Sequence, residues 1–261
     1  MKFIDWFAGI GGFRKGLELS GHECIGFCEF DKFAYMSYVM MHTATAEQIS
    51  YVASIDAPPK KNGDRNLNKR QKEILKEEYR NGEWYANDVS RVFAGDIPRA
   101  DMWTFGFPCQ DISVAGKQAG FNGKRSSLFF KITGLIRDLE EKDRPSTLLI
   151  ENVKNLLSVN RGFDFLKVLI ELDEIGYDAE WQVLQSSDFG VPQNRLRTYV
   201  VGHLRGRSRR KVFPISGTYE KNNCKQVAQM YGTEKEPNPQ AGRIYDARGV
   251  SPSLDSCGGG E

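Results

Sequence analysis

The sequence has no hydrophobic run long enough to cross a membrane and only a few cysteines. No stretch of about eighteen consecutive apolar residues occurs, and the start, MKFIDWFAGIGG, reaches glycines after a single lysine where a signal peptide has an apolar core. The five cysteines form no CxxC pair, and their odd number suits neither a disulfide framework nor a structural zinc site. We therefore expect a cytoplasmic protein with free thiols, without a metal site or a membrane partner.

A strong charge of one sign is missing as well. The 36 Lys and Arg residues nearly balance the 34 Asp and Glu residues, so the formal net charge is only +2 and composition alone does not indicate a nucleic-acid-binding protein. The 261 residues are 40% hydrophobic, which is enough for a sizeable core and excludes disorder as the default state. Any function must therefore be inferred from motifs.

Short apolar strands alternate with helical patterns through about the first two hundred residues. Lys2 to Ala8 is apolar and strand-like, and the glycines after it lead into helical spacing up to Leu19. The same alternation predicts strands at 23–27, 102–105, 147–150, 180–185 and 197–202, and helices at 32–41, 128–140 and 163–175. The pattern predicts an α/β fold with a doubly wound, Rossmann-like sheet in residues 1–204.

Two segments differ from this pattern. Between Thr43 and Asn81 a proline- and lysine-containing stretch precedes a charged one, in which glutamates interleave with lysines. We interpret this segment as an inserted loop and a solvated helix. Residues 205–261 begin with five crowded basic residues and continue with many Gly, Asn, Pro and Ser, which predicts a linker and a smaller, loop-rich domain. The basic residues at 205–211 predict phosphate contacts, although a solvated linker would have the same composition.

The first candidate site is the stretch Asp5–Phe13, which contains the glycine turn, Phe7–Gly12, together with Glu29 at the end of the next strand. Glycines let a ligand approach the backbone, and an acid at the end of the second strand suits ribose hydroxyls. The spacing is not GxGxxG, and no P-loop lysine follows. A cofactor without a pyrophosphate, S-adenosylmethionine in particular, is therefore favoured over one that carries a pyrophosphate. The alternative is that the glycine turn serves only packing.

The second candidate site combines a thiol, a carboxylate and two guanidinium groups. Cys109 follows the strand at 102–105, and Glu151 follows the next apolar strand, so both belong to the carboxyl edge of the sheet. Arg195 and Arg197 open a further strand, and alternation puts both on one face. A lone cysteine is more often a small buried residue, but these groups together predict a catalytic set.

Taken in chain order, these motifs resemble those of the DNA (cytosine-5)-methyltransferase family. The resemblance is carried by Phe7–Gly12, Glu29, Gly106–Gln110, Gly116–Phe121, Glu151–Val153 and Gly190–Arg197. It covers most of residues 2–202 apart from the insertion. In the tail, Arg243–Gly249, Ser253, Leu254 and the glycines at 258–260 resemble the target-recognition domain of the shorter bacterial members. The resemblance implies a methyltransferase sheet followed by a small target-recognition domain, in a prokaryotic or phage modification system.

The resemblance also implies a cofactor site for S-adenosylmethionine, which leaves as S-adenosylhomocysteine. It implies that Phe7 stacks on the adenine and Glu29 binds the ribose, with Asp88 or Asp96 as the adenine-contacting acid. We choose Asp88, because Asp96 has the spacing that usually leads into the cysteine strand. The implied cofactor-binding residues are Phe7, Ala8, Gly9, Ile10, Gly11, Gly12, Glu29, Phe30, Asp88, Val89, Pro108 and Leu128.

The implied reaction begins when the Cys109 thiolate adds to carbon 6 of cytosine, which makes carbon 5 nucleophilic toward the sulfonium methyl group. Glu151 would donate a proton at N3 if its site raises the carboxyl pKa or if the base supplies the proton. Arg195 would hold the base carbonyl, supported by Arg197. No residue of the sequence is identified as the base that removes the carbon 5 proton, and water can serve.

The implied partner is duplex DNA from which the target cytosine is flipped. The segment 110–127 resembles the family's mobile catalytic loop, with a plain surface loop as the alternative. The implied DNA-binding residues are Gln110, Ser113, Gln118, Arg125, Arg248 and Ser253.

The sequence departs from the family pattern at its end. The arginine-leucine-glycine-phenylalanine type of motif and the Gly-Asn-x-Val helix of the family do not follow Gly260. A split enzyme completed by a second polypeptide, a truncated chain and a divergent stand-alone enzyme are the three explanations. The competing functions are a DNA-binding subunit that is inactive alone, an RNA cytosine methyltransferase and, least favoured by the cysteine, glutamate and arginine set, a nicotinamide dehydrogenase.

Overall fold

A seven-stranded sheet forms the centre of the protein, in the order β3-β2-β1-β4-β5-β7-β6. The computed structural model describes residues 1–57, 67–107, 127–191, 193–207, 210–217, 226–229 and 243–245. The strands are β1 (Lys2–Trp6), β2 (Glu23–Cys28), β3 (Trp84–Ala86), β4 (Met102–Phe105), β5 (Thr147–Val153), β6 (Tyr177–Gln185) and β7 (Leu196–Leu204). Neighbouring strands are parallel except at β7, which is antiparallel to both β5 and β6. A separate antiparallel pair joins β8 (Gln226–Gln229) to β9 (Arg243–Tyr245).

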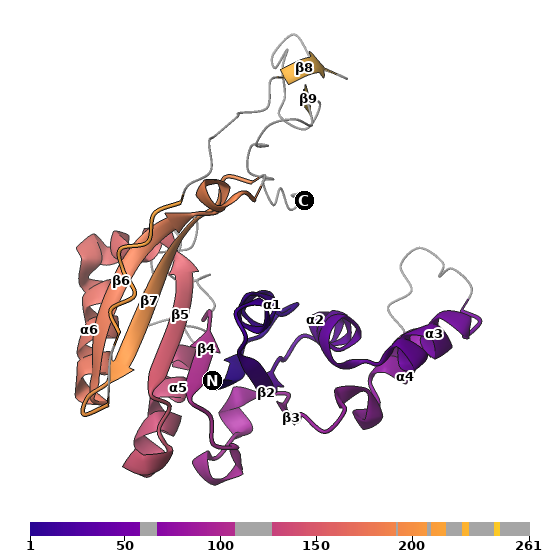
Figure 1. Cartoon of the computed structure of the whole chain (residues 1–261), viewed down its shortest axis with the longest axis horizontal. Coiled ribbons are helices and arrows are strands. Elements are labelled where there is room, and N and C mark those ends of the chain that lie inside the picture. Colours follow the sequence, from indigo (N-terminus) through magenta and orange to yellow (C-terminus); the bar gives the residue numbers. More distant parts are fainter. Residues whose placement is uncertain are drawn as a thin grey trace.

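Helices lie on both faces of the sheet. Successive side chains of a strand point to opposite faces, and here both faces are apolar. The α-helices are α1 (Gly12–Leu19), α2 (Lys32–Tyr38), α3 (Ala46–Ser54), α4 (Lys69–Ile74), α5 (Ser127–Asp138) and α6 (Phe163–Glu174). Helices α5 and α6 pack on the face that carries Ile4 and Trp103, whereas Leu17 of α1 packs with Phe3 and Met102 on the other face. Figure 1 shows α6 beside β6 at one end of the sheet and α3 with α4 at the far end of the molecule.

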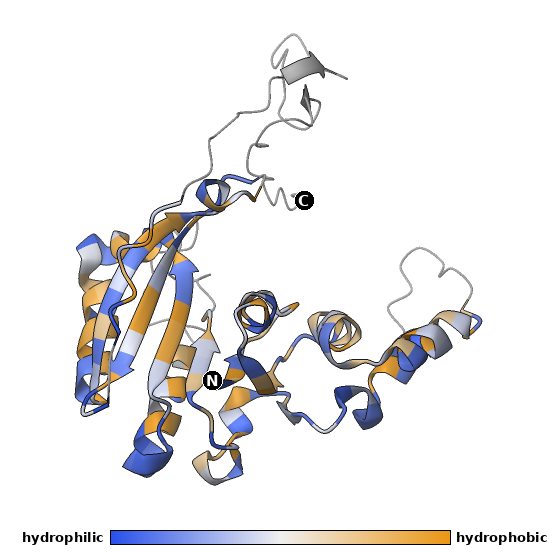
Figure 2. Cartoon of the chain, in the orientation of Figure 1, coloured by the Kyte–Doolittle hydropathy of each residue, from blue (hydrophilic) through white to orange (hydrophobic). Residues whose placement is uncertain are grey.

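The alternation behind this packing is visible as bands of hydrophobic and hydrophilic residues along β5, β7 and α6 (Figure 2). In β5, Leu148 and Ile150 are buried, whereas Thr147, Leu149 and Glu151, which alternate with them, are only half-buried. Within the described part of the chain, no helix is long and apolar enough to cross a membrane.

The predicted α/β Rossmann-like class is confirmed, and most predicted elements lie within a few residues of the observed ones. The strand predicted at 102–105 coincides with β4. The first strand ends at Trp6 and not at Ala8, because Phe7 adopts a left-handed conformation with φ of 53°. Strand β3 was not predicted, and its length of three residues is too short for an alternation pattern.

The interpretation of residues 43–81 as an inserted loop with one solvated helix underestimates the helices of this segment, and its proline- and lysine-containing stretch at 58–66 lies outside the described residues. The described part of this segment contains α3, α4 and the 3-10 helix η2 (Glu77–Arg80), and Val52, Ile74 and Tyr79 from these helices are buried together. Both α-helices begin with a capping box, at Thr45 and Asn68. The segment is therefore a packed helical insertion.

The basic residues that follow β7 make contacts within the chain. Arg205 pairs with Asp173 and Asp178, and Arg207 donates to the backbone carbonyls of residues 141 and 142. These contacts lie at the amino edge of the sheet, because β7 ends there and its His203 is opposite Thr147, the first residue of β5. The predicted phosphate contacts are therefore not supported at Arg205 and Arg207, and the domain division at 204/205 stays a prediction.

The packed insertion predicts a large difference between two of its tyrosines. Tyr79 is 1% exposed, so Tyr79→Ala should lower the free energy of unfolding by about 3 kcal/mol or more, since a buried aromatic side chain is lost. Tyr51→Ala, in the same segment but 55% exposed, should change it by less than about 0.5 kcal/mol. Urea denaturation of both variants measures the difference, and similar losses would contradict the packing described here.

Candidate functional site

Three strands end side by side at the carboxyl edge of the sheet. In the parallel ladders, Trp6 of β1 pairs with Phe105 of β4, and Phe105 pairs with Ile150 of β5. The next residues along the three strands, Phe7, Gly106 and Glu151, therefore lie in one row. Open α/β sheets bind their ligands at this edge.

The glycine turn, Phe7–Gly12, follows β1 and reverses the chain into α1. Phe7, Gly9 and Gly11 all have positive φ angles, of 53°, 56° and 86°. The buried Glu29 carboxylate fixes the turn, since Oε2 accepts from the Gly9 amide at 2.7 Å and Oε1 accepts from the Asp31 amide at 2.6 Å. Each carboxylate oxygen can accept a second hydrogen bond, so Glu29 keeps acceptor capacity for a ligand.

A cavity of about 680 Å³ opens beside this turn, and we call it the Phe7 cavity. It brings together Phe7, Glu29, Phe30, Asp88, Val89 and Leu128 of the expected cofactor-binding set, and it is also lined by Cys28, Asp31, Asn87 and Gly106. Residues 8–12 of the set form the rest of the glycine turn. Asp96 is not among the lining residues, so the choice of Asp88 over Asp96 agrees with the geometry.

The Phe7 cavity fits a nucleoside cofactor that carries a positive charge. Its volume is typical of small-molecule sites, and Phe30, which is 73% exposed, offers an aromatic face. Its described lining contains the acids Glu29, Asp31 and Asp88 and no Lys or Arg, which disfavours phosphates. Hydrogen bonds from the Ser90 hydroxyl and amide lower the pKa of Asp88, so this acid is an ionised acceptor. S-adenosylmethionine, a sulfonium without phosphates, matches these properties.

Beyond Gly106 lies the second half of the site, centred on Glu151. Arg197 Nε lies 2.8 Å and Arg195 Nη2 lies 3.9 Å from Glu151 Oε1. A Cβ on Gly106 would stand 3.1 Å from Glu151 Oε2, so the missing side chain lets the carboxylate lie against the end of β4. Strand β7 begins at Leu196, so Arg195 precedes the strand, contrary to expectation, yet both arginines approach the same carboxylate.

The remaining expected site residues lie outside the described part of the chain. They are Pro108, Cys109, Gln110, Ser113, Gln118, Arg125, Arg248 and Ser253. Phe107 is buried at the end of the described segment, and its carbonyl accepts from Asn152 Nδ2 at 3.5 Å. Cys109, the expected cysteine, therefore follows Phe107 by two residues, and the Phe107 carbonyl is held by Asn152, the neighbour of Glu151 in the sequence.

The model of the C-5 cytosine-specific DNA methylase family matches residues 1–62 and 60–246. The chain belongs to this family. It is 32% identical over 244 residues to the type II methyltransferase M.HgiCI of Herpetosiphon aurantiacus, in a match that covers 90% of this chain and 47% of that protein. It is 32% identical to the type II methyltransferase M.HhaI of Haemophilus parahaemolyticus, over 77% of this chain and 48% of that protein. The chain thus spans about half the length of these curated relatives.

Solved structures of methyltransferases share the fold of this family member. The S. pombe Dnmt2 methyltransferase superposes with a TM-score of 0.54 at 18% identity, covering 85% of this chain and 59% of that one. The Entamoeba histolytica methyltransferase EhMeth superposes with a TM-score of 0.56 at 18% identity, covering 84% of this chain and 57% of that one. At this identity, the likeness establishes the fold alone.

One residue near the site, Tyr199, was missed by sequence reasoning. Tyr199 lies opposite Glu151 in the β5–β7 ladder, and its pKa is raised by burial and by the negative charge of Glu151. Tyr199 follows Arg197 by two residues, and this spacing was the sequence signal that could have identified it. Asp5 is fully buried at the base of the glycine turn, where it accepts from Thr104 Oγ1 at 2.9 Å and so links β1 to β4.

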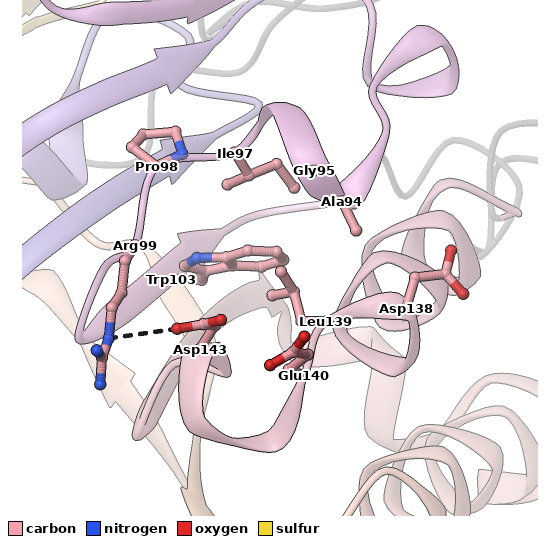
Figure 3. A pocket seen from close by; sticks show the side chains of 10 residues that line it. All are labelled: Ala94, Gly95, Ile97, Pro98, Arg99, Trp103, Asp138, Leu139, Glu140 and Asp143. Carbon is pink, nitrogen blue, oxygen red and sulfur yellow. Dashed lines mark ion pairs between the residues drawn. The ribbon is translucent and has the colours of Figure 1, made fainter.

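A second cavity, which we call the Trp103 cavity, has a volume of about 430 Å³. Figure 3 shows its lining, which consists of Trp103 of β4, residues between 94 and 99 that precede this strand, and residues between 138 and 143 at the end of α5 and after it. Arg99 and Asp143 form a 3.7 Å ion pair beside the indole of Trp103. None of the expected cofactor-binding or catalytic residues lines it.

The buried Asp5 predicts a pH dependence of stability. Burial raises the pKa of Asp5 to about 7, against the opposing hydrogen bond from Thr104 and the charge of Arg14. Between about pH 4 and pH 7 the folded chain therefore binds a proton that the unfolded chain releases, so wild-type stability should fall as pH rises through this window. Asp5→Asn removes this loss, because an amide does not ionise.

Urea denaturation between pH 5 and pH 8 tests this expectation. The free energy of unfolding of Asp5→Asn should gain on the order of 2 kcal/mol relative to wild type as the pH rises. The exposed Asp56 provides the control, because Asp56→Asn should stay parallel to wild type. A parallel profile for Asp5→Asn would contradict the raised pKa.

Proposed function

We propose that this chain transfers a methyl group from S-adenosylmethionine to carbon 5 of a cytosine in a specific sequence of duplex DNA. The observation that carries the proposal is the position of Gly106. This residue lines the Phe7 cavity, and its backbone also lies against the Glu151 carboxylate that the two arginines approach. A nucleoside site and a polar, arginine-containing site therefore meet at a single backbone position.

The Phe7 cavity would hold the cofactor through the chain's own side chains. Phe7 and Phe30 would contact the adenine, Glu29 the ribose hydroxyls and Asp88 the adenine amino group, which is a donor. When bound, S-adenosylmethionine supplies an electrophilic methyl group on a sulfonium and leaves as S-adenosylhomocysteine. The acidic lining of the cavity favours the charged methyl donor over the neutral product.

Cys109, Glu151 and the arginines would activate the cytosine. Carbon 5 is a poor nucleophile, and a bond from the Cys109 sulfur to carbon 6 turns the ring into an enamine that is nucleophilic at carbon 5. Glu151 would hold a proton at N3, which relieves negative charge on the ring, while Arg195 would hold the base carbonyl oxygen with support from Arg197. After carbon 5 has gained its methyl group, its proton leaves to water, the carbon 6–sulfur bond breaks and the thiolate is restored.

Duplex DNA must release the cytosine from its base stack before these groups can reach it. Gln110, Ser113, Gln118 and Arg125 would contact DNA from the loop that follows Cys109, and Arg248 and Ser253 from the tail. Closure of such a loop excludes water from the reacting atoms. Since the chain spans about half the length of its curated relatives, the proposal is for the chain acting together with the remaining segments of the family.

DNA that contains 5-fluorocytosine tests the proposal, because fluorine cannot leave carbon 5 as a proton does. With labelled S-adenosylmethionine, the chain should form a labelled covalent adduct that survives denaturing electrophoresis. Cys109→Ser should lower adduct formation by more than about a thousandfold, because it removes the nucleophile. Cys224→Ser, which changes a cysteine outside the family motifs, should keep it.

The controls separate the alternatives. Unlabelled duplex DNA, and not RNA, should compete for the adduct. If the chain alone gives no adduct, the family's remaining segments are added as a second polypeptide, and adduct formation should then appear. An adduct that persists in Cys109→Ser, or none in either arrangement on DNA of mixed sequence, would contradict the proposal.

A further inference from the structure

A π-helical turn behind the glycine turn brings His42 against its backbone. Helix α2 was expected to run to Met41, but it ends at Tyr38 and continues as the π-helix η1 (Val39–Thr43). The π-helix places the His42 ring so that Nε2 lies 2.9 Å from the carbonyl oxygen of Ile10. Because a carbonyl oxygen only accepts, Nε2 is the donor in this contact. Single π-helical turns are frequent at functional sites.

The contact between His42 and the glycine turn is tight. A Cβ on Gly11 would overlap with the His42 ring, whereas one on Gly9 would meet no atom within 4 Å. The turn therefore has free space beside Gly9, whereas the space beside Gly11 is occupied by the His42 ring. The imidazole also packs on the buried ring of Tyr38, with centroids 5.0 Å apart, and a Cβ on Gly11 would stand 3.1 Å from Tyr38 as well. His42 and Tyr38 therefore both lie against the turn at Gly11.

The helical insertion holds this π-helix in place. Thr43 Oγ1 donates to the carbonyl of Tyr79 at 2.7 Å, and Asn81 Nδ2 donates to the carbonyl of Thr43. Arg14, which is 4% exposed, donates to the His42 carbonyl and forms an ion pair with Glu83 at the end of the insertion. Three separate links therefore connect residues 79–83 to the segment that carries His42.

We propose that His42 is a positioning residue that holds the Ile10–Gly11 backbone and thereby sets the affinity of the chain for its cofactor. The inference rests on the proposed function, because it takes the Phe7 cavity to be the site of S-adenosylmethionine. In this arrangement the helical insertion supports the cofactor site from behind. His42 is not among the residues that line the Phe7 cavity, so it acts on the site through the glycine turn.

Three substitutions separate the hydrogen bond of His42 from its packing. His42→Ala removes both, His42→Phe keeps a ring without a donor, and His42→Gln keeps a donor of similar reach. Titration calorimetry with S-adenosylhomocysteine should show affinity lowered by about five- to tenfold in His42→Ala and His42→Phe, and restored to near wild type in His42→Gln. Met41→Ala is the matched control, since Met41 lies on the same π-helix and is 63% exposed.

Hydrogen exchange without ligand provides a second measurement. The amides of residues 9–12 should exchange faster in His42→Ala than in wild type, while those of β4 and β5 should not change. If His42→Ala and wild type show equal exchange in the turn, or equal affinity for S-adenosylhomocysteine, the proposed role of His42 is overturned and the cofactor assignment is not. A wild-type chain that does not bind S-adenosylhomocysteine would overturn the cofactor assignment and this inference together.

Discussion

The hydrogen-bonded register of β1, β4 and β5 is the constraint on which the site depends. Because Trp6, Phe105 and Ile150 lie in one row, the residues that follow them are neighbours although they are far apart in the sequence. The antiparallel direction of β7 completes the arrangement, since an antiparallel strand begins at the edge where its neighbours end. Arg197, paired with Val153, reaches Glu151 for this reason. In a parallel strand the same arginine would lie at the opposite edge.

Charge separates the two halves of the site that meet at Gly106. The described lining of the Phe7 cavity carries Glu29, Asp31 and Asp88 without a basic residue, which suits a positively charged sulfonium nucleoside. On the other side of Gly106, guanidinium groups stand beside Glu151 and suit a ligand that presents carbonyl oxygens. This division of charge agrees with the proposed transfer from a cationic donor to a pyrimidine.

Much of this arrangement could be predicted from the sequence, because apolar strands that end in chemically distinctive residues are visible as patterns. Strand β4, the glycine turn and the position of Glu151 beside Gly106 are of this kind. The direction of β7 was not predictable, because alternating side chains look the same in parallel and antiparallel strands. The packing of residues 43–81 was hidden as well, since the charged surface of α4 and η2 masks the buried Ile74 and Tyr79. The π-helix that places His42 has no signal in the spacing of 32–41.

The central claim is that one edge of the sheet holds the cofactor beside the residues that act on the base. A crystal structure of the chain with S-adenosylhomocysteine tests it most directly. The account predicts the ligand in the Phe7 cavity, with its ribose at Glu29 and its sulfur end toward Gly106 and Glu151. S-adenosylhomocysteine bound in the Trp103 cavity, or a Phe7 cavity that stays empty at saturating ligand, would contradict it.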